Sequence, residues 1–184
     1  MKRILAFAIS LFFLFNLLTF PGNFTLGGMF GNYFVADPIY KDLYGSGNFI
    51  FWGFVSIGVM NRLELRGDIG YFNKRGKTSL TGESTSFSLI PITIGARFRL
   101  INLEHIRPYL GAGLNYCLFN EKARIGDTSD TTLGLHFEGG SYIVIAERLY
   151  FDLNFRYSIS DAKPFDETIK LGGFSTGIGV GYTF

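Results

Sequence analysis

Two residues of the sequence could perform acid–base or metal chemistry because of their spacing. His136 and Glu138 lie two residues apart, and a β-strand places residues i and i+2 on the same face. Such a pair could act as a general base or as half of a metal site. The only other histidine is His105, in a predicted short turn, so a site with several histidines cannot be assembled. We therefore predict that His136 makes a hydrogen bond inside the protein, and we expect no catalytic residue, no metal ligand and no cofactor.

Two glycine-rich stretches, at residues 111–113 and 177–181, could be mistaken for phosphate-binding loops. They lack the spacing of the dinucleotide-binding and Walker motifs, and they lie within predicted strands rather than before a helix. Small residues in a crowded interior explain them better.

A set of charged residues shares one face of several predicted strands. Burying such charges without partners would cost several kcal/mol each. We therefore predict that they form a network of ion pairs and hydrogen bonds that fills the interior; the alternative is that they line a narrow polar pore. The predicted network consists of Glu64, Arg66, Asp68, Arg97, Arg99, His136, Glu138, Asp152 and Arg156.

Strands must position these residues, because apolar and polar side chains alternate along the segments that carry them. Residues 149–159 are the clearest case, since Phe151, Leu153 and Phe155 alternate with Asp152 and Asn154. A period of two places the two sets on opposite faces. The predicted strands cover residues 23–35, 49–60, 63–72, 88–100, 108–119, 132–145, 149–159 and 172–184.

The connections between these strands alternate in length. Short links lie near residues 61–62, 102–106 and 146–148. Long polar links cover residues 36–47, 73–83, 120–131 and 160–170. An even number of antiparallel strands can close with both termini at one end, with short turns on one rim and long loops on the other.

The volume of a closed barrel decides which face of the strands points outward. An eight-stranded barrel has an interior just wide enough to be filled by side chains or to hold one small ligand. The apolar face carries many Phe and Tyr residues, and these could not all enter that space. We therefore predict an all-β protein, an eight-stranded antiparallel up-and-down transmembrane β-barrel. A secreted barrel that carries a ligand is the alternative that turns the same face inward.

Aromatic residues near the predicted strand ends are expected to form girdles at the membrane interfaces. Trp52 is expected to anchor near the outer interface. The girdle residues are Tyr71, Tyr116, Phe119, Tyr157, Tyr182 and Phe184.

The first 22 residues have the layout of a secretory signal peptide. Lys2 and Arg3 precede an apolar run that ends at Pro21 and Gly22. No small-x-small cleavage triplet is present, so a retained N-terminal anchor helix is the alternative. The predicted organisation is a signal peptide at residues 1–22 and one barrel domain at residues 23–184.

The composition excludes several classes of protein. Only 17% of the residues are charged, against about 25% in soluble domains. The net charge of +2 comes from Lys2 and Arg3, since the other 15 basic residues balance 15 acidic ones, and this gives no electrostatic case for nucleic acid. Cys117 is the only cysteine, which excludes an intramolecular disulfide.

The end of the chain resembles the C-terminal signal by which bacterial barrel proteins are recognised for insertion. A terminal Phe184 follows Ile178, Val180 and Tyr182 at alternate positions. The segments 90–98 and 106–116 resemble the central hairpin of the small outer-membrane β-barrel superfamily, which includes outer-membrane proteins X and W, the opacity proteins and the barrel half of outer-membrane protein A.

This resemblance implies a location in the outer membrane of a Gram-negative bacterium. It specifies the architecture better than the activity. We expect a barrel with a structural or surface-interaction role that displays four extracellular loops. A narrow channel for small or hydrophobic molecules is one alternative. A lipid A-modifying enzyme is another, although His136 and Ser141 do not reproduce the motif of the lipid A deacylases.

The expected partners follow from the same resemblance. They are outer-membrane lipid and lipopolysaccharide, the barrel-assembly machinery during insertion and a surface ligand, with no nucleic acid and a monomeric state. Lys74, Arg75 and Lys77 are expected on a basic solvated loop at residues 73–83, where they could contact lipopolysaccharide phosphates or a host surface.

Overall fold

The computed structural model describes residues 24–77, 84–101, 103–123, 126–162 and 169–184. The predicted signal peptide at residues 1–22 lies outside these residues. Among the described residues, no helix is both long and apolar enough to cross a membrane.

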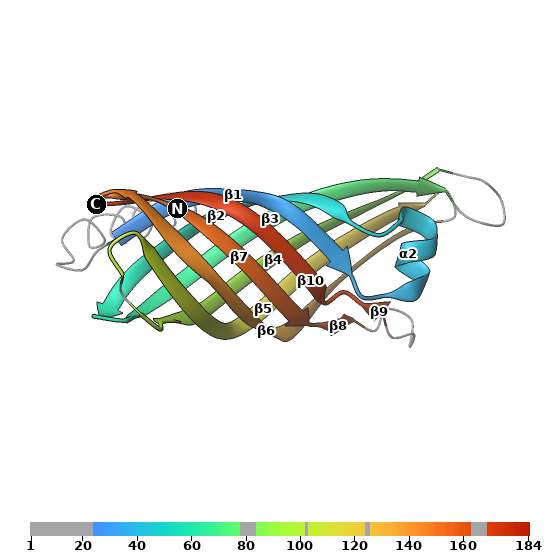
Figure 1. Cartoon of the computed structure of the whole chain (residues 1–184). Helices are drawn as coiled ribbons and strands as arrows, with labels where there is room; N and C mark the ends of the chain where they lie inside the picture. Colours follow the sequence, from blue (N-terminus) through green and yellow to red (C-terminus); the bar gives the residue numbers. More distant parts are fainter. Residues whose placement is uncertain (1–23, 78–83, 102, 124–125, 163–168) are drawn as a thin grey trace, which may run out of the picture.

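Eight antiparallel strands form a closed barrel (Figure 1), which confirms the predicted fold. Each strand pairs with its neighbours along the chain, and the first pairs with the last. Backbone N–H and C=O groups are therefore satisfied between strands around the whole circumference. The strands are β1 (Phe24–Val35), β2 (Asn48–Met60), β3 (Leu63–Lys77), β4 (Ser84–Arg99), β5 (Ile106–Ala123), β6 (Gly126–Ala146), β7 (Leu149–Ile159) and β10 (Gly173–Thr183).

The two ends of the barrel differ. At one end, called the turn end, short links join β2 to β3, β4 to β5 and β6 to β7, and the Phe184 N–H donates to the Phe24 carbonyl at 2.8 Å. At the other end, called the helix end, lie the helix α2 (Pro38–Tyr44) and a small sheet of β8 (Asp161–Ala162) with β9 (Ile169–Lys170) (Figure 1).

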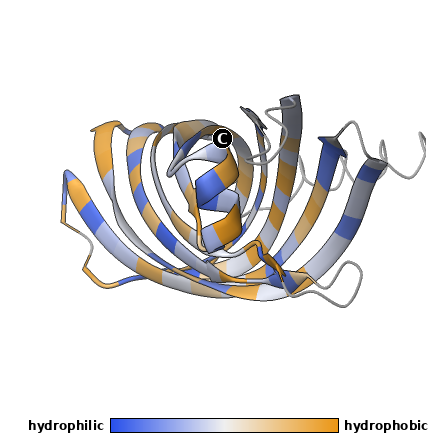
Figure 2. Cartoon of the chain, turned by 90° about the vertical axis from the view of Figure 1, so that its right-hand side faces the viewer, coloured by the Kyte–Doolittle hydropathy of each residue, from blue (hydrophilic) through white to orange (hydrophobic). Residues whose placement is uncertain are grey.

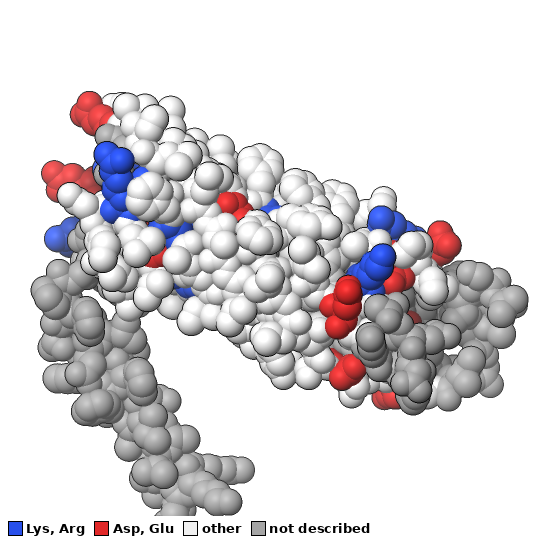
Figure 3. Space-filling view, turned by 90° about the horizontal axis from the view of Figure 1, so that it is seen from below, with Lys and Arg blue, Asp and Glu red and all other residues white. Residues whose placement is uncertain are grey.

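The outer wall of the barrel is apolar. Phe51, Ile69 and Leu133 are 61%, 55% and 66% exposed, although a soluble protein would bury most such side chains. Hydrophobic and hydrophilic residues alternate along the ribbons in Figure 2. On the face in Figure 3, acidic and basic side chains gather at the two ends and the surface between them carries very few. This pattern matches a band of hydrocarbon around the middle of the barrel.

Four strands extend further than the sequence pattern indicates. β3 continues to Lys77, β4 begins at Ser84, and β5 and β6 pair up to Ala123 and Gly126. The predicted basic loop is therefore wrong for Lys74, Arg75 and Lys77, whose backbone belongs to β3. Polar residues on both faces of a strand resemble a loop in sequence, and here pairing with the neighbouring strand sets the structure instead.

The interior near the helix end is apolar, which corrects the expectation of a polar lumen throughout. Trp52 and Phe119 are buried in this core rather than placed at a membrane interface. Each of the two residues lies an even number of positions from residues on its strand that face inward, so its side chain faces inward too. Residues 49–54 are apolar on both faces of the strand, so the sequence did not show which of them face the interior. Besides these two, the core contains Met29, Tyr33, Val35, Tyr40, Tyr44, Ile50, Phe72, Phe87, Leu89, Cys117, Ala162 and Leu171.

Candidate functional site

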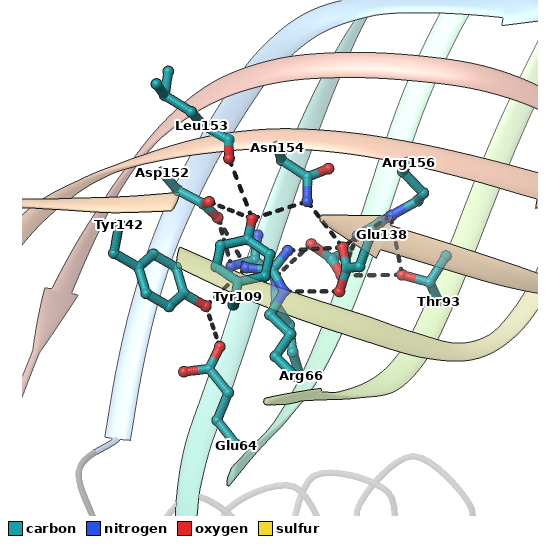
Figure 4. A network of polar contacts seen from close by, with 12 residues as sticks. Glu64, Arg66, Thr93, Tyr109, Glu138, Tyr142, Asp152, Leu153, Asn154 and Arg156 are labelled. Atoms are coloured by element: carbon teal, nitrogen blue, oxygen red, sulfur yellow. Dashed lines mark hydrogen bonds and ion pairs between the residues drawn. The ribbon is translucent and has the colours of Figure 1, made fainter. Parts of the chain in front are cut away.

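Six charged side chains form a closed ring of ion pairs across the lumen, in the half nearer the turn end (Figure 4). Positive and negative groups alternate around it, and three arginines balance three carboxylates. Each side chain is at most 5% exposed. The ring runs from Arg97 through Glu138, Arg156, Asp68, Arg66 and Asp152 back to Arg97.

Glu138 is the most heavily bonded member of the ring. Arg97 donates from Nε and Nη2 to its two carboxylate oxygens, at 2.7 and 2.8 Å. Arg156 Nη2 and Asn154 Nδ2 donate to its Oε2 atom at 2.9 and 3.0 Å. Bidentate, charge-assisted bonds of this kind offset the large cost of removing the ions from water.

Neutral and aromatic side chains complete the ring (Figure 4). The Tyr109 hydroxyl donates to Asp152 at 2.6 Å, and the Thr93 hydroxyl donates to Asp68 at 3.0 Å. The guanidinium of Arg66 lies 3.6 Å from the ring centre of Phe54, a cation–π contact. Among the buried polar atoms of the six ring residues, only Arg66 Nη2 lacks a hydrogen-bond partner in the described part of the chain, so little free hydrogen-bonding capacity is left for a ligand.

Three residues of the predicted network lie outside the ring. Glu64 accepts a hydrogen bond from Tyr142, whose hydroxyl also accepts one from Arg97 at 2.8 Å, so Glu64 is linked to the ring through a tyrosine. Arg99 instead donates to the Asn61 carbonyl at 2.6 Å, at the turn end.

His136 is buried beside the ring without an ion pair to it among the described residues. Its Nδ1 atom has no hydrogen-bond partner in the described part of the chain. A Cβ atom at Gly113 would approach the imidazole to 2.8 Å and one at Gly95 to 3.1 Å, so these glycines make room for the ring. Within the described ranges, no three His, Cys, Asp or Glu side chains are placed to hold a metal ion.

An aromatic cluster forms a second layer in the lumen, toward the helix end. Phe87 lies at its centre, with ring centroids 4.9 Å from Tyr40, 5.7 Å from Tyr44 and 5.9 Å from Phe119. Because Tyr40 and Tyr44 are one helical turn apart, both point from α2 into the barrel. Figure 2, which views this end, places α2 within the outline of the strands.

Polar contacts hold α2 in this position. Asp37 caps the helix through Oδ1, which accepts from the Tyr40 N–H at 3.0 Å, and its Oδ2 accepts from the Lys170 N–H at 3.0 Å. The Tyr40 hydroxyl donates to Asn48 at 2.8 Å, and that of Tyr44 donates to Glu121. Burial raises the pKa of both tyrosines, so both phenols remain protonated donors.

A polar cavity of about 340 Å³ lies between the ion-pair ring and the turn end. Arg99, Arg107 and Arg148 line it together with Glu64 and Glu147. Tyr142, whose hydroxyl accepts from Arg97 of the ring, also lines this cavity.

Several residues of the lumen were absent from the predicted network. Tyr109 and Tyr142 were missed as ring partners, and Phe72 and Phe87 as part of the second layer. A period of two places all of them on the same face as the inward charges, so strand parity could have identified them. α2 leaves a weaker signal, since it has only seven residues.

A closed antiparallel barrel with an apolar outer wall and inward-facing charged side chains defines a transmembrane β-barrel. The model of the family described as outer membrane protein beta-barrel domain matches residues 7–184, and the chain belongs to this family. The protein is therefore a bacterial outer-membrane barrel. The turn end faces the periplasm and the helix end faces the outside of the cell.

Solved structures with the same fold include three outer-membrane proteins. The outer membrane protein OprG from Pseudomonas aeruginosa has a TM-score of 0.71 at 16% identity, over 89% of this chain and 96% of that one. Neisserial surface protein A has a TM-score of 0.66 at 18% identity, over 88% of this chain and 97% of that one. The attachment invasion locus protein Ail of Yersinia pestis, solved with the heparin analogue sucrose octasulfate, has a TM-score of 0.59 at 16% identity, over 90% and 100%. At these identities the likeness shows the fold alone. A comparison of the sequence with curated proteins found no significant match.

Proposed function

We propose that this barrel is closed to transport and acts through the surface that it presents outside the cell. The two layers across the lumen carry this proposal. Arg97 in the ion-pair ring is 0% exposed and Phe87 in the aromatic cluster is 3% exposed. A molecule passing through would have to break the ion pairs of the ring and then displace α2. Breaking one buried ion pair costs about 3–5 kcal/mol.

Conductance in a planar bilayer tests this closure. The purified protein is inserted from vesicles, after a heat-dependent gel shift has shown that its barrel is folded. We expect this protein to give no reproducible channel steps. The alternative function, a narrow channel, predicts discrete steps of constant size. Such steps from folded protein would overturn the proposal.

The extended parts of β3 to β6 form a sheet above the membrane band, and its outer face is polar. Arg75 on β3, Ser86 on β4 and Lys122 on β5 are register partners on neighbouring strands. The side chains of Arg75 and Lys122 are exposed. The row ends at the acidic Asp127 on β6, the register partner of Lys122. The two cations on either side of the hydroxyl suit a sulfate or phosphate group that binds over β3 to β5. Ail was solved with a sulfated sugar, which supports an anionic glycan as the class of surface ligand.

Replacing both cations of this row should weaken binding of a sulfated glycan. We expect the double substitution Arg75→Gln and Lys122→Gln to reduce heparin affinity about fivefold to tenfold, because each exposed contact contributes up to about 1 kcal/mol. Surface plasmon resonance on barrels in nanodiscs measures the change. The double substitution Lys41→Gln and Lys170→Gln removes the same charge from exposed positions elsewhere at the helix end. An equal loss in both variants would indicate nonspecific attraction and contradict a defined row.

A further inference from the structure

The seam where β1 pairs with β10 carries two polar side chains on the lipid-facing wall. Asn32 and Thr176 lie directly opposite each other in the register. Along β1, Asn32 stands between the outward-facing Phe30 and Phe34, which are 50% and 38% exposed. The two polar residues therefore interrupt an otherwise apolar surface of the barrel.

Neither side chain has a hydrogen-bond partner in the described part of the chain. Asn32 is exposed and Thr176 is half-buried on the outside of the barrel. A polar group that faces hydrocarbon without a partner is costly. The amide of Asn32 has donors and an acceptor, and the hydroxyl of Thr176 has one donor and two acceptor positions, so the pair can satisfy a ligand that offers both.

Because these two side chains are shorter than their neighbours, the wall is hollowed here. A mainly apolar groove of about 320 Å³ has Phe49 and Phe155 at its sides and backbone at Gly31 and Gly177 in its floor. Phe49 is the register partner of Asn32, and Phe155 is that of Thr176. The polar pair thus lies between two aromatic walls.

The groove is amphipathic along the barrel axis. Asn32 and Thr176 lie toward its extracellular end, whereas Phe30, Ile178 and Leu153 line it toward the middle of the bilayer. Above the polar pair, Phe34 and Phe174 stack with centroids 6.4 Å apart. An outer-leaflet lipid has the same direction of polarity, with its head toward the cell exterior and its chain pointing inward.

We propose that this groove binds one acyl chain of lipopolysaccharide, through the amide and hydroxyl of an amide-linked hydroxyacyl group. Such a group offers donors and acceptors close together at the top of a long apolar chain, which matches Asn32 and Thr176 above Phe30 and Ile178. The ester of a phospholipid offers acceptors alone, so it satisfies fewer of the groups in the pair. A second copy of the protein would place its own hollow against this one across a two-fold axis, which leaves the groove unfilled.

Two probes that differ by a single hydroxyl test the proposal. Native mass spectrometry of the folded barrel in micelles should show that N-(β-hydroxymyristoyl)glucosamine binds about threefold to tenfold more tightly than N-myristoylglucosamine, the range expected for a hydrogen bond within a membrane. This comparison uses the unaltered protein. Equal binding of the two probes would overturn the proposal.

Variants then test whether the groove causes the preference for the hydroxylated probe. The double substitution Asn32→Leu and Thr176→Val should abolish it, whereas Asn120→Leu, the same change of residue in the extended part of β5, should leave it intact. A gel shift on heating shows that each variant folds. If the double variant still prefers the hydroxylated probe, the assignment of the site is wrong. A dimer of the unaltered protein that disappears when Asn32 is replaced would also contradict the assignment, because a second copy would then occupy the groove.

Discussion

Glu138→Gln is expected to lower the free energy of unfolding by about 3–5 kcal/mol, the usual cost of breaking a buried ion pair from one side. The glutamine keeps the shape but removes one of three negative charges, so Arg97 and Arg156 face each other with reduced compensation. Its amide also turns donor hydrogens toward guanidinium groups that can only donate. Urea titration of the barrel in vesicles measures the change, with fluorescence of the single, buried Trp52 as the reporter.

Glu147→Gln provides the matched control. Glu147 is exposed at the turn end, where the same substitution should change stability by less than about 0.5 kcal/mol. Adding Arg156→Met to Glu138→Gln restores the charge balance with a side chain of similar length, so part of the lost stability should return. Similar small effects for the two glutamate variants would contradict the view that the ring works as a closed electrostatic unit.

The sequence was sufficient to predict the barrel because the alternation of side chains depends only on the backbone. Residues 149–159 were predicted as a strand from their alternation, and β7 has the same limits. The apolar excess on one face then required a lipid exterior, since an eight-stranded barrel has no room for it. These steps use local periodicity and volume, and neither depends on contacts distant in sequence.

The pairing within the ring could not be predicted in the same way. Arg66 and Asp152 are 86 residues apart and meet only because the register of several strands brings them to one level. The two-residue alternation placed both side chains in the interior, but it does not show which carboxylate faces which arginine. The same limit explains the aromatic layer, because inward parity does not distinguish the polar level of the lumen from the apolar level above it.

Phe87→Ala is expected to cost about 3–5 kcal/mol of stability and to release α2 from the mouth of the barrel. Its ring contacts Tyr40 and Tyr44 on the helix and also Phe72 and Phe119 on the strands, so the substitution removes the common contact between helix and barrel. Hydrogen exchange of the amides in α2 should therefore accelerate by more than exchange in the strands.

Comparison with Ile39 separates this effect from a general weakening of the helix. Ile39 belongs to α2 but is 67% exposed, so Ile39→Ala should change stability by no more than about 0.5 kcal/mol and leave exchange in α2 slow. Phe87→Leu, which fills most of the cavity, should lose less than Phe87→Ala because the cost of such changes grows with the empty volume. Unchanged exchange of α2 in Phe87→Ala would mean that Asp37 and the tyrosine hydroxyls hold the helix without the aromatic cluster. In that case the extracellular closure of the lumen would depend on hydrogen bonds rather than on packing.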